Sequence, residues 1–253
     1  MMKTNPLSIL LIMLFFISAC TPVSPRVSKT SVDSAEAQHL LTSLKNKNHT
    51  LNSFKGIGKI KIWDKDKFQI ARVAWLGAAP GKLRIEALNV SGQPVASIAG
   101  DGKWFYYRNH DDFYKKQASD PSLKKIVSVP VRSSDIFSML AGRVPIQEHH
   151  LALIVKHESE YVLELQSKWG NIIEKIYFDT SKTIVSKIEM FDAFGSLTYR
   201  AAFGRIRTIG DYQIPFTLEL SDDDDDAGFQ LHISNYWTGV PVPPSKFILT
   251  PTD

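Results

Sequence analysis

The chain has 253 residues, with 30 Lys and Arg against 26 Asp and Glu, so its formal net charge at pH 7 is +4. Hydrophobic residues make up 43% of it, which is enough to build a full core. The basic residues are scattered among acids and form no stripe with aromatic stacking platforms, so we expect no nucleic-acid binding. The length suits one domain or two small ones.

Residues 1–19 are typical of a secretory signal peptide. Lys3 supplies a basic head, and the apolar stretch from Leu7 to Ile17 is too short for a membrane span, which needs ~20 residues. Ile17-Ser18-Ala19-Cys20 then ends at the single cysteine of the sequence. This ending resembles a bacterial lipobox, which implies cleavage before Cys20 and lipidation of that residue. The alternative is an ordinary signal peptide whose cleavage site happens to include a cysteine.

Lipidation would hold the protein at a membrane surface. One acyl chain binds a bilayer only marginally, at ~0.8 kcal/mol per buried CH₂, so the three chains implied by a lipobox would make the anchor effectively permanent. Thr21 stands where lipoproteins retained in the inner membrane typically carry Asp. The resemblance therefore implies the outer membrane of a Gram-negative bacterium, on its periplasmic face, with membrane lipids as the first expected partner.

Residues 20–32 are expected to form a flexible tether, because Thr21 to Ser31 is rich in Pro, Ser and Thr and has no apolar periodicity. About 11 extended residues would reach on the order of 35 Å. Asp33 to Lys47 is predicted to be a helix, since Asp33 can cap it. The residues that recur on one apolar face of this helix are Ala37, Leu40, Leu41 and Leu44.

From Leu51 onward the apolar period changes from 3.6 to 2, which predicts β-strands. The turns between them are too short to hold crossover helices, so neighbouring strands must be antiparallel. The predicted strands are Phe54 to Trp63, Phe68 to Trp75, Lys82 to Leu88, Pro94 to Ala99, Lys103 to Arg108, Leu151 to Lys156, Tyr161 to Gln166, Asn171 to Asp179, Val185 to Phe191, Leu197 to Phe203, Tyr212 to Leu220 and Gly228 to Trp237.

Helical segments interrupt the strands near the middle of the chain. Asp120 to Ile126 can form a helical turn, and Ser134 to Ala141 is predicted to be a helix that Gly142 ends. A long antiparallel meander must hide its edges or curl. The predicted fold of residues 33–238 is therefore mainly β: a strongly curved antiparallel sheet, an incomplete barrel of about 11–12 strands, with an N-terminal helix and a short helical lid.

The tail from Gly239 to Asp253 is rich in proline, which argues against both strand and helix. We expect residues 239–253 to lie over the surface of the domain.

The stretch from Leu51 to Trp237 resembles the LolA/LolB family of periplasmic lipoprotein carriers and receptors. A lipid anchor points to the LolB-type receptors, since LolA carriers are soluble. The family fold is an incomplete barrel with helices as a lid over an apolar cavity, which agrees with the predicted meander. The matching segments are Leu51 to Gly58, Ala71 to Trp75, Leu83 to Gly92, Asp101 to Tyr107 and Ile136 to Pro145.

One segment departs from the family pattern. LolB-type proteins carry a protruding loop with an exposed large apolar residue, used to deliver cargo into the membrane. The matching loop here is Asn89-Val90-Ser91-Gly92. Ser91 stands at the position of the large residue, and Val90 is the one apolar candidate. The departure leaves room for a relative with different cargo.

Inward-facing side chains of the strands and the lid would line the cavity that the resemblance implies. The candidates are Val73, Trp75, Ile85, Ile98, Trp104, Tyr106, Phe137 and Leu140. The alternative is that they fill a dry core, because a parity error of one residue reverses the face of a strand.

The resemblance implies a monomer that binds acyl chains, accepts acylated cargo from a LolA-like periplasmic carrier and releases it passively at the outer membrane. A competing hypothesis keeps the same fold with a filled core. The protein would then be a structural or interaction lipoprotein that assists envelope assembly through a partner.

No set of residues points to catalysis, a metal or a cofactor, so we expect no enzyme activity. His149 and His150 are adjacent and would point to opposite sides of a strand. The run Asp222 to Asp226 supplies carboxylates, but Ala227 stands where an EF-hand loop needs glycine. We interpret the run as a solvated hairpin loop, with weak Ca²⁺ binding as the alternative.

Overall fold

The computed structural model of the protein describes residues 34–110, 112–157 and 160–251. The predicted signal peptide, Cys20 and the tether lie outside the described residues. The strands are β1 (Ser53–Asp64), β2 (Lys67–Ala78), β3 (Lys82–Leu88), β4 (Pro94–Gly100), β5 (Trp104–Arg108), β6 (Phe113–Gln117), β7 (Leu151–His157), β8 (Glu160–Gln166), β9 (Ile172–Phe178), β10 (Val185–Phe191), β11 (Leu197–Ile209), β12 (Tyr212–Ser221) and β13 (Ala227–Thr238). The helices are α2 (Ser34–Asn46), α3 (Lys124–Val127), α4 (Ser133–Leu140) and the 3₁₀-helix η1 (Pro244–Phe247).

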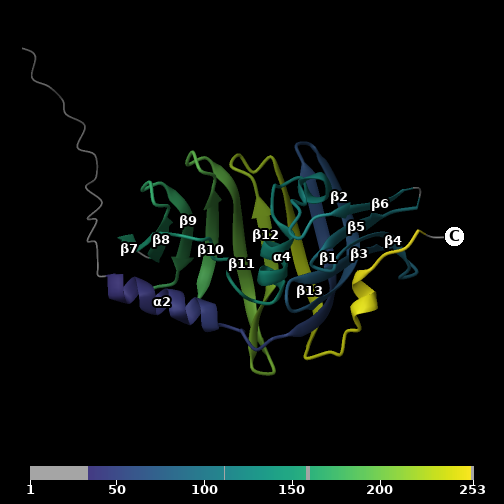
Figure 1. The fold of residues 1–253 in the computed structure, drawn as a ribbon, viewed down its shortest axis with the longest axis horizontal. Coiled ribbons are helices and arrows are strands. Elements are labelled where there is room, and N and C mark those ends of the chain that lie inside the picture. Colours follow the sequence, from purple (N-terminus) through teal and green to yellow (C-terminus); the bar gives the residue numbers. More distant parts are fainter. Residues whose placement is uncertain (1–33, 111, 158–159, 252–253) are drawn as a thin grey trace, which may run out of the picture.

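The described strands form one 13-stranded sheet in the order β6-β5-β4-β3-β2-β1-β13-β12-β11-β10-β9-β8-β7, with antiparallel neighbours throughout (Figure 1). Within the described residues the sheet is not closed, and its edges are β6 and β7. The predicted mainly-β fold with an N-terminal helix and inserted helices is confirmed. The strong curvature stays a prediction.

One strand, β6, is absent from the sequence-based prediction. All five of its residues are exposed, so its sequence shows no alternation between apolar and polar positions. It pairs only with β5 and forms one edge of the sheet among the described strands. An edge strand without a buried face carries no period-2 signal to detect.

Alternation along β1 shows how the sequence selects the buried face. Phe54, Gly56 and Gly58 are buried, whereas Lys55 and Lys59 on the opposite face are exposed. The glycines make room for large rings from neighbouring strands. A Cβ on Gly56 would lie 2.2 Å from Cζ2 of Trp75, and a Cβ on Gly77 would lie 2.4 Å from Cζ of Phe54. Glycine is therefore required at both positions by the close approach of an aromatic ring.

Helix α2 lies along the β7 side of the sheet at one end of the strands, coloured purple in Figure 1. Its predicted apolar stripe of Ala37, Leu40, Leu41 and Leu44 is buried in the core. Lys182, in the β9–β10 turn, forms an ion pair with Glu36 of this helix.

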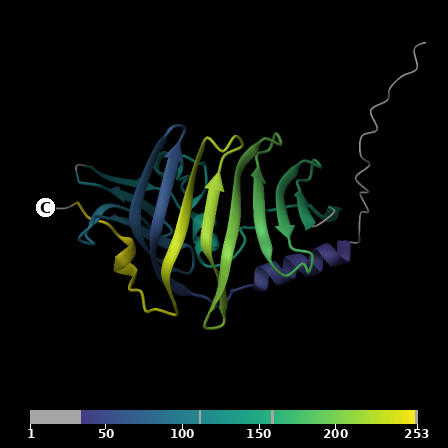
Figure 2. The ribbon, with the colours of Figure 1, turned by 180° about the vertical axis from the view of Figure 1, so that it is seen from behind.

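The segment between β6 and β7 runs from one edge of the sheet to the other and carries α3 and α4 across the buried face (Figure 1). The C-terminal tail packs on the opposite face of the sheet, shown in yellow in Figure 2. There Leu249 is buried with Ala99 and Tyr106. The two faces are thus covered by different segments of the chain.

Antiparallel pairing also sorts the turns into two groups. One end of the strands, which we call the hairpin end, holds six turns that antiparallel pairing places together. They are the turns β1–β2, β3–β4, β5–β6, β8–β9, β10–β11 and β12–β13. The β9–β10 turn that contacts α2 lies at the opposite end.

Candidate functional site

The candidate site is the buried face of the sheet beneath α4. Six of the predicted cavity residues meet there. Ile85 packs against one buried cluster, and the other five belong to that cluster. These five are Val73, Trp75, Ile98, Phe137 and Leu140. The sheet and the inserted helix therefore bring together residues that are far apart in the sequence.

The other two predicted residues, Trp104 and Tyr106, do not join this cluster, and grouping them with it was wrong. Ile98 pairs with Tyr107, so Tyr107 shares its face and Tyr106 points to the other side of the sheet. Tyr106 is buried against Leu249 of the tail, and Trp104 packs at the edge of that second cluster. The residues of β5 that face the main cluster are Phe105 and Tyr107, one position away from the predicted Trp104 and Tyr106.

The interior beneath α4 is filled with side chains in this conformation. The ring of Phe54 is fully buried, and its centroid lies 5.3 Å from that of Phe137 and 5.8 Å from that of Tyr236. Trp75 lies against Gly56, and among the described residues its Nε1 finds no hydrogen-bond partner. An acyl chain could therefore enter only after some of these side chains have moved.

Helix α4 is held at its first turn by one carboxylate. The side chain of Asp120 accepts hydrogen bonds from the amide N–H of Ser134 at 2.9 Å and from the hydroxyls of Ser133 and Ser134 at 3.1 and 2.8 Å. The bond from the Ser134 amide satisfies one of the backbone donors that the start of a helix leaves free.

The other end of α4 is held by polar groups from the sheet and from the segment after α2. The Tyr236 hydroxyl donates to the Leu140 carbonyl oxygen at 2.7 Å, and the Asn48 amide donates to the Ala141 carbonyl oxygen at 3.0 Å. Gly142 follows with φ +68°, where a Cβ would lie 2.2 Å from the Gln213 carbonyl oxygen. The predicted end of the helix at Gly142 is confirmed. Both ends of α4 are thus fixed by a few polar contacts.

Helix α4 and the sheet each contribute a buried acidic residue. Asp135 of α4 and Glu174 of β9 are both buried, and the Tyr199 hydroxyl donates to Oδ2 of Asp135 at 3.0 Å. Arg132, at the surface, lies 3.4 Å from the same carboxylate. Burial raises the pKa of the Tyr199 hydroxyl, and the charge of Asp135 raises it further.

The carboxyl group of Glu174 accepts fewer hydrogen bonds than that of Asp135. Its Oε2 accepts a hydrogen bond from the amide N–H of Gln147 at 2.8 Å, but no described residue forms a hydrogen bond with its Oε1. Burial raises the pKa of Glu174 to about 8; the Gln147 N–H and the Arg132 guanidinium oppose the shift, and the charge of Asp135 adds to it. Burial therefore favours the protonated, uncharged form of Glu174.

The sequence analysis missed this acidic pair, although one signal for it exists. Glu174 has the same strand parity as Ile176 and Phe178, both of which are buried. A carboxylate on the apolar face of a predicted strand indicates a buried titratable group.

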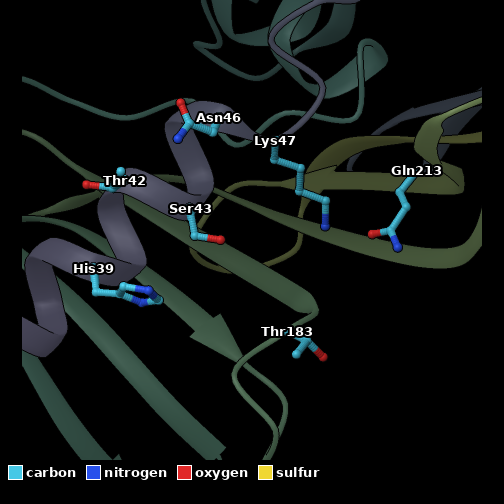
Figure 3. A pocket seen from close by; sticks show the side chains of 7 residues that line it. All are labelled: His39, Thr42, Ser43, Asn46, Lys47, Thr183 and Gln213. Carbon is cyan, nitrogen blue, oxygen red and sulfur yellow. The ribbon is translucent and has the colours of Figure 1, made fainter.

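Two open hollows lie near α2 and α4. The first, of about 540 Å³, lies beside α2; Figure 3 shows its lining side chains, His39, Thr42, Ser43, Asn46, Lys47, Thr183 and Gln213. The second, of about 640 Å³, lies along the chain after α4 and is lined by Leu44, Lys45, Ser138 and residues 143–149. Neither contains a predicted cavity residue, and the many polar side chains around both make them poor sites for an acyl chain.

The loop matched to the delivery loop is a tight hairpin turn at the hairpin end. The Asn89 side-chain oxygen accepts hydrogen bonds from the Ser91 hydroxyl at 2.8 Å and from the Gln93 amide at 2.9 Å. Gly92 takes φ +85°, and Val90 is 99% exposed at the tip. The turn presents one small apolar side chain to its surroundings.

Among the described residues, no three His, Cys, Asp or Glu side chains are placed to hold a metal ion together. No helix in the same part of the chain is long and apolar enough to span a membrane.

Comparison with known proteins gives a match at the level of the fold. No family model and no curated protein matches the sequence. Crystal structures do match. A domain described as an outer membrane lipoprotein-sorting protein from Vibrio parahaemolyticus has 12% identity and a TM-score of 0.64, over 85% of this chain and 97% of that one.

Two further crystal structures agree with the first. A LolA superfamily protein from Nitrosomonas europaea has 16% identity and a TM-score of 0.60, over 84% of this chain and 97% of that one. A DUF1329 family protein from Desulfovibrio piger has 11% identity and a TM-score of 0.64, over 85% of this chain and 97% of that one. The chain therefore has the fold of lipoprotein-sorting and LolA superfamily domains.

Proposed function

We propose that the protein is a non-enzymatic, lipid-anchored envelope protein that binds an acyl chain of lipid-modified cargo between its sheet and α4. It receives this cargo from a soluble periplasmic LolA-like carrier and releases it at the outer membrane. The observation that carries the proposal is the apolar cluster of Val73, Trp75 and Ile98 beneath Phe137 and Leu140 of a short inserted helix. The fold, shared with lipoprotein-sorting domains, supports it.

Because the interior is filled, binding requires α4 to move outward. The move would expose Ile136, Phe137, Met139 and Leu140, at a cost of roughly 1.5–3 kcal/mol for each side chain, or about 6–12 kcal/mol together. A chain of about 16 carbons buried in their place would regain on the order of 12 kcal/mol. The two amounts are similar, so the exchange is close to balanced, which suits passive transfer in either direction.

The polar contacts at the two ends of α4 add to the free-energy cost of moving the helix. Each hydrogen bond, such as those to Asp120 and Leu140, contributes about 0.5–1.5 kcal/mol net. Burial favours the uncharged form of Glu174, which would avoid an uncompensated charge on that residue in the apolar wall when the site opens.

The test is saturable binding of a fluorescent fatty-acid probe to the full chain. Trp75→Ala, in the cluster, is expected to change the affinity several-fold, because the ring lies on the proposed wall. Trp104→Ala is the matched control on the opposite face and is expected to leave the affinity unchanged. The absence of saturable binding in the unmodified protein would contradict the proposal.

A second function is favoured by one observation, the filled interior itself. A chain whose core stays filled would act as a structural or interaction lipoprotein that assists envelope assembly by contacting a partner. The same assay separates the two functions, because a permanently closed interior takes up no probe.

A further inference from the structure

Two aromatic side chains project from neighbouring turns at the hairpin end. Trp169, in the β8–β9 turn, is 79% exposed, and Phe194, in the β10–β11 turn, is 93% exposed. The side-chain amide of Asn171 donates to the carbonyl oxygen of Ala193 at 3.1 Å and ties the two turns together. In Figures 1 and 2 these turns lie next to each other at the hairpin end of strands β8 to β11.

The two turns have the same construction. Each places its aromatic residue directly before a glycine in the left-handed region, Gly170 at φ +81° and Gly195 at φ +85°. The β3–β4 turn is built in the same way around Gly92, with Ser91 at the equivalent position. The large apolar side chain that Ser91 lacks is therefore present at the structurally equivalent position of two other turns of the same end.

We propose that Trp169 and Phe194 form a bilayer-contact site, which inserts into the interfacial region of an electrically neutral lipid surface. Exposed aromatic side chains lose water contact favourably on such insertion, and Trp prefers the interface of a bilayer.

Backbone N–H groups in both turns form hydrogen bonds within their own turn. The Phe194 amide donates to Oδ1 of Asp192 at 2.8 Å, and the Gly195 amide donates to the Asp192 carbonyl oxygen at 3.1 Å. The Trp169 amide donates to the Ser167 hydroxyl at 3.3 Å. Backbone donors that are satisfied within the turn do not have to be stripped of water when the tip enters lipid.

The charges around the tips select the kind of lipid surface. The two turns carry one cation, Lys168, whose ammonium lies 5.0 Å from the Trp169 ring centroid, and one anion, Asp192. They are therefore neutral together. The next turn at the same end, β12–β13, holds the run Asp222 to Asp226, of which Asp223 and Asp225 pair with Arg200. A surface rich in anionic lipid would be repelled by this run, whereas a zwitterionic surface would not.

The chain outside the described residues is long enough to permit this orientation. Cys20 precedes Ser34, the first residue of α2, by 14 positions (34 − 20), which extended would reach about 46 Å at ~3.3 Å per residue. Strands β8 and β9 have 7 residues each and so are roughly 23 Å long. An anchored domain can thus turn its hairpin end toward the bilayer; the inference rests on the proposed function only for this anchoring.

The test uses tryptophan fluorescence of the full chain, reconstituted in vesicles of phosphatidylcholine and phosphatidylethanolamine with or without brominated acyl chains. The difference between the unmodified protein and Trp169→Phe isolates the Trp169 signal. This signal is expected to be quenched by the brominated lipid, shifted to shorter wavelength and protected from iodide. The Trp237 signal, isolated with Trp237→Phe, is the control, because Trp237 is 40% exposed at the opposite end of the sheet.

A second pair of variants tests the coupling of the tips. Phe194→Ser is expected to lower the lipid quenching of Trp169, whereas Ile184→Ser, in an exposed turn at the opposite end, is expected to leave it unchanged. Replacing part of the lipid with phosphatidylglycerol is expected to weaken the quenching. A Trp169 signal that stays as accessible to iodide with vesicles as without them would overturn the proposal. Stronger lipid quenching in vesicles that contain phosphatidylglycerol would contradict the preference for an electrically neutral lipid surface. Because no cargo is present, the outcome is separate from that of the fatty-acid probe assay.

Discussion

Replacing Glu174 with Gln is expected to remove a pH dependence that this one residue gives to the stability of the protein. The folded-state pKa of Glu174 is about 8, against an ordinary value of 4.5, because the carboxyl group is buried beside Asp135. In the unfolded chain the group loses its proton above about pH 4.5. Between pH 4.5 and 8, folding therefore takes up a proton at this site, and the stability falls as the pH rises.

The size of this loss of stability follows from the difference between the two pKa values of Glu174. Each unit of pKa difference corresponds to about 1.4 kcal/mol, so the 3.5-unit window between 4.5 and 8 corresponds to a loss on the order of 5 kcal/mol by pH 8. Gln cannot ionise, and its side-chain oxygen can still accept from the Gln147 amide. The stability of Glu174→Gln relative to the unmodified protein should therefore rise by about 1.4 kcal/mol per pH unit across the window.

The assay is urea unfolding of both proteins at several pH values from 5 to 8. Asp179→Asn is the control. Hydrogen bonds from the Ile184 amide and the Ser181 hydroxyl lower the pKa of Asp179 to about 2, so its stabilising effect is lost only as the pH falls below 4. Parallel loss of stability by the unmodified protein and Glu174→Gln between pH 5 and 8 would refute a buried, protonated Glu174.

Three further substitutions, two of them with a matched control, test the fold and the delivery loop. Gly77→Ala places a Cβ 2.4 Å from the buried Phe54 ring and is expected to cost about 1–3 kcal/mol in urea unfolding. Gly204→Ala, whose Cβ would meet Thr217 at 3.5 Å, should change stability by about 0.5 kcal/mol or less, and equal effects would contradict the packing. Leu249→Ala is expected to cost about 2–5 kcal/mol, against about 0.5 kcal/mol or less for the exposed Ile248→Ala, and an equal cost would mean that the tail does not pack on the sheet. Val90→Glu is expected to slow release of acylated cargo into vesicles while probe binding stays intact, because a charge resists entry into the bilayer. Normal release by Val90→Glu excludes this loop from delivery.

The fold could be predicted because its signals are local. Alternation along strands such as β1 and β12 fixes the buried face, and short turns fix antiparallel neighbours. Strand β6 escaped detection because all its residues are exposed. The pairing of β1 with β13 joins the two halves of the sheet and depends on contacts between residues more than 150 positions apart, which no local pattern contains.

The candidate site could be predicted only in part. Trp104 to Tyr107 are four aromatic residues in a row, so the sequence shows no alternation from which to read the parity of β5. On the outward face of β5, Tyr106 is buried against Leu249 of the tail and Trp104 is partly buried beside it. Leu249 follows these residues by about 140 positions in the chain. The bond from Tyr199 to Asp135 is likewise a product of the tertiary fold, since the two residues lie on separate elements.

The most direct test of an acyl-binding interior is photo-crosslinking to acylated cargo. A photoreactive residue would replace Ile98, on the buried face, or Tyr106, on the opposite face of the adjacent strand. Transfer of an acyl-labelled lipoprotein to the full chain is expected to give crosslinks to the acyl chain from position 98 and none from position 106. Crosslinks from position 106 alone, or equally from both positions, would contradict binding beneath α4.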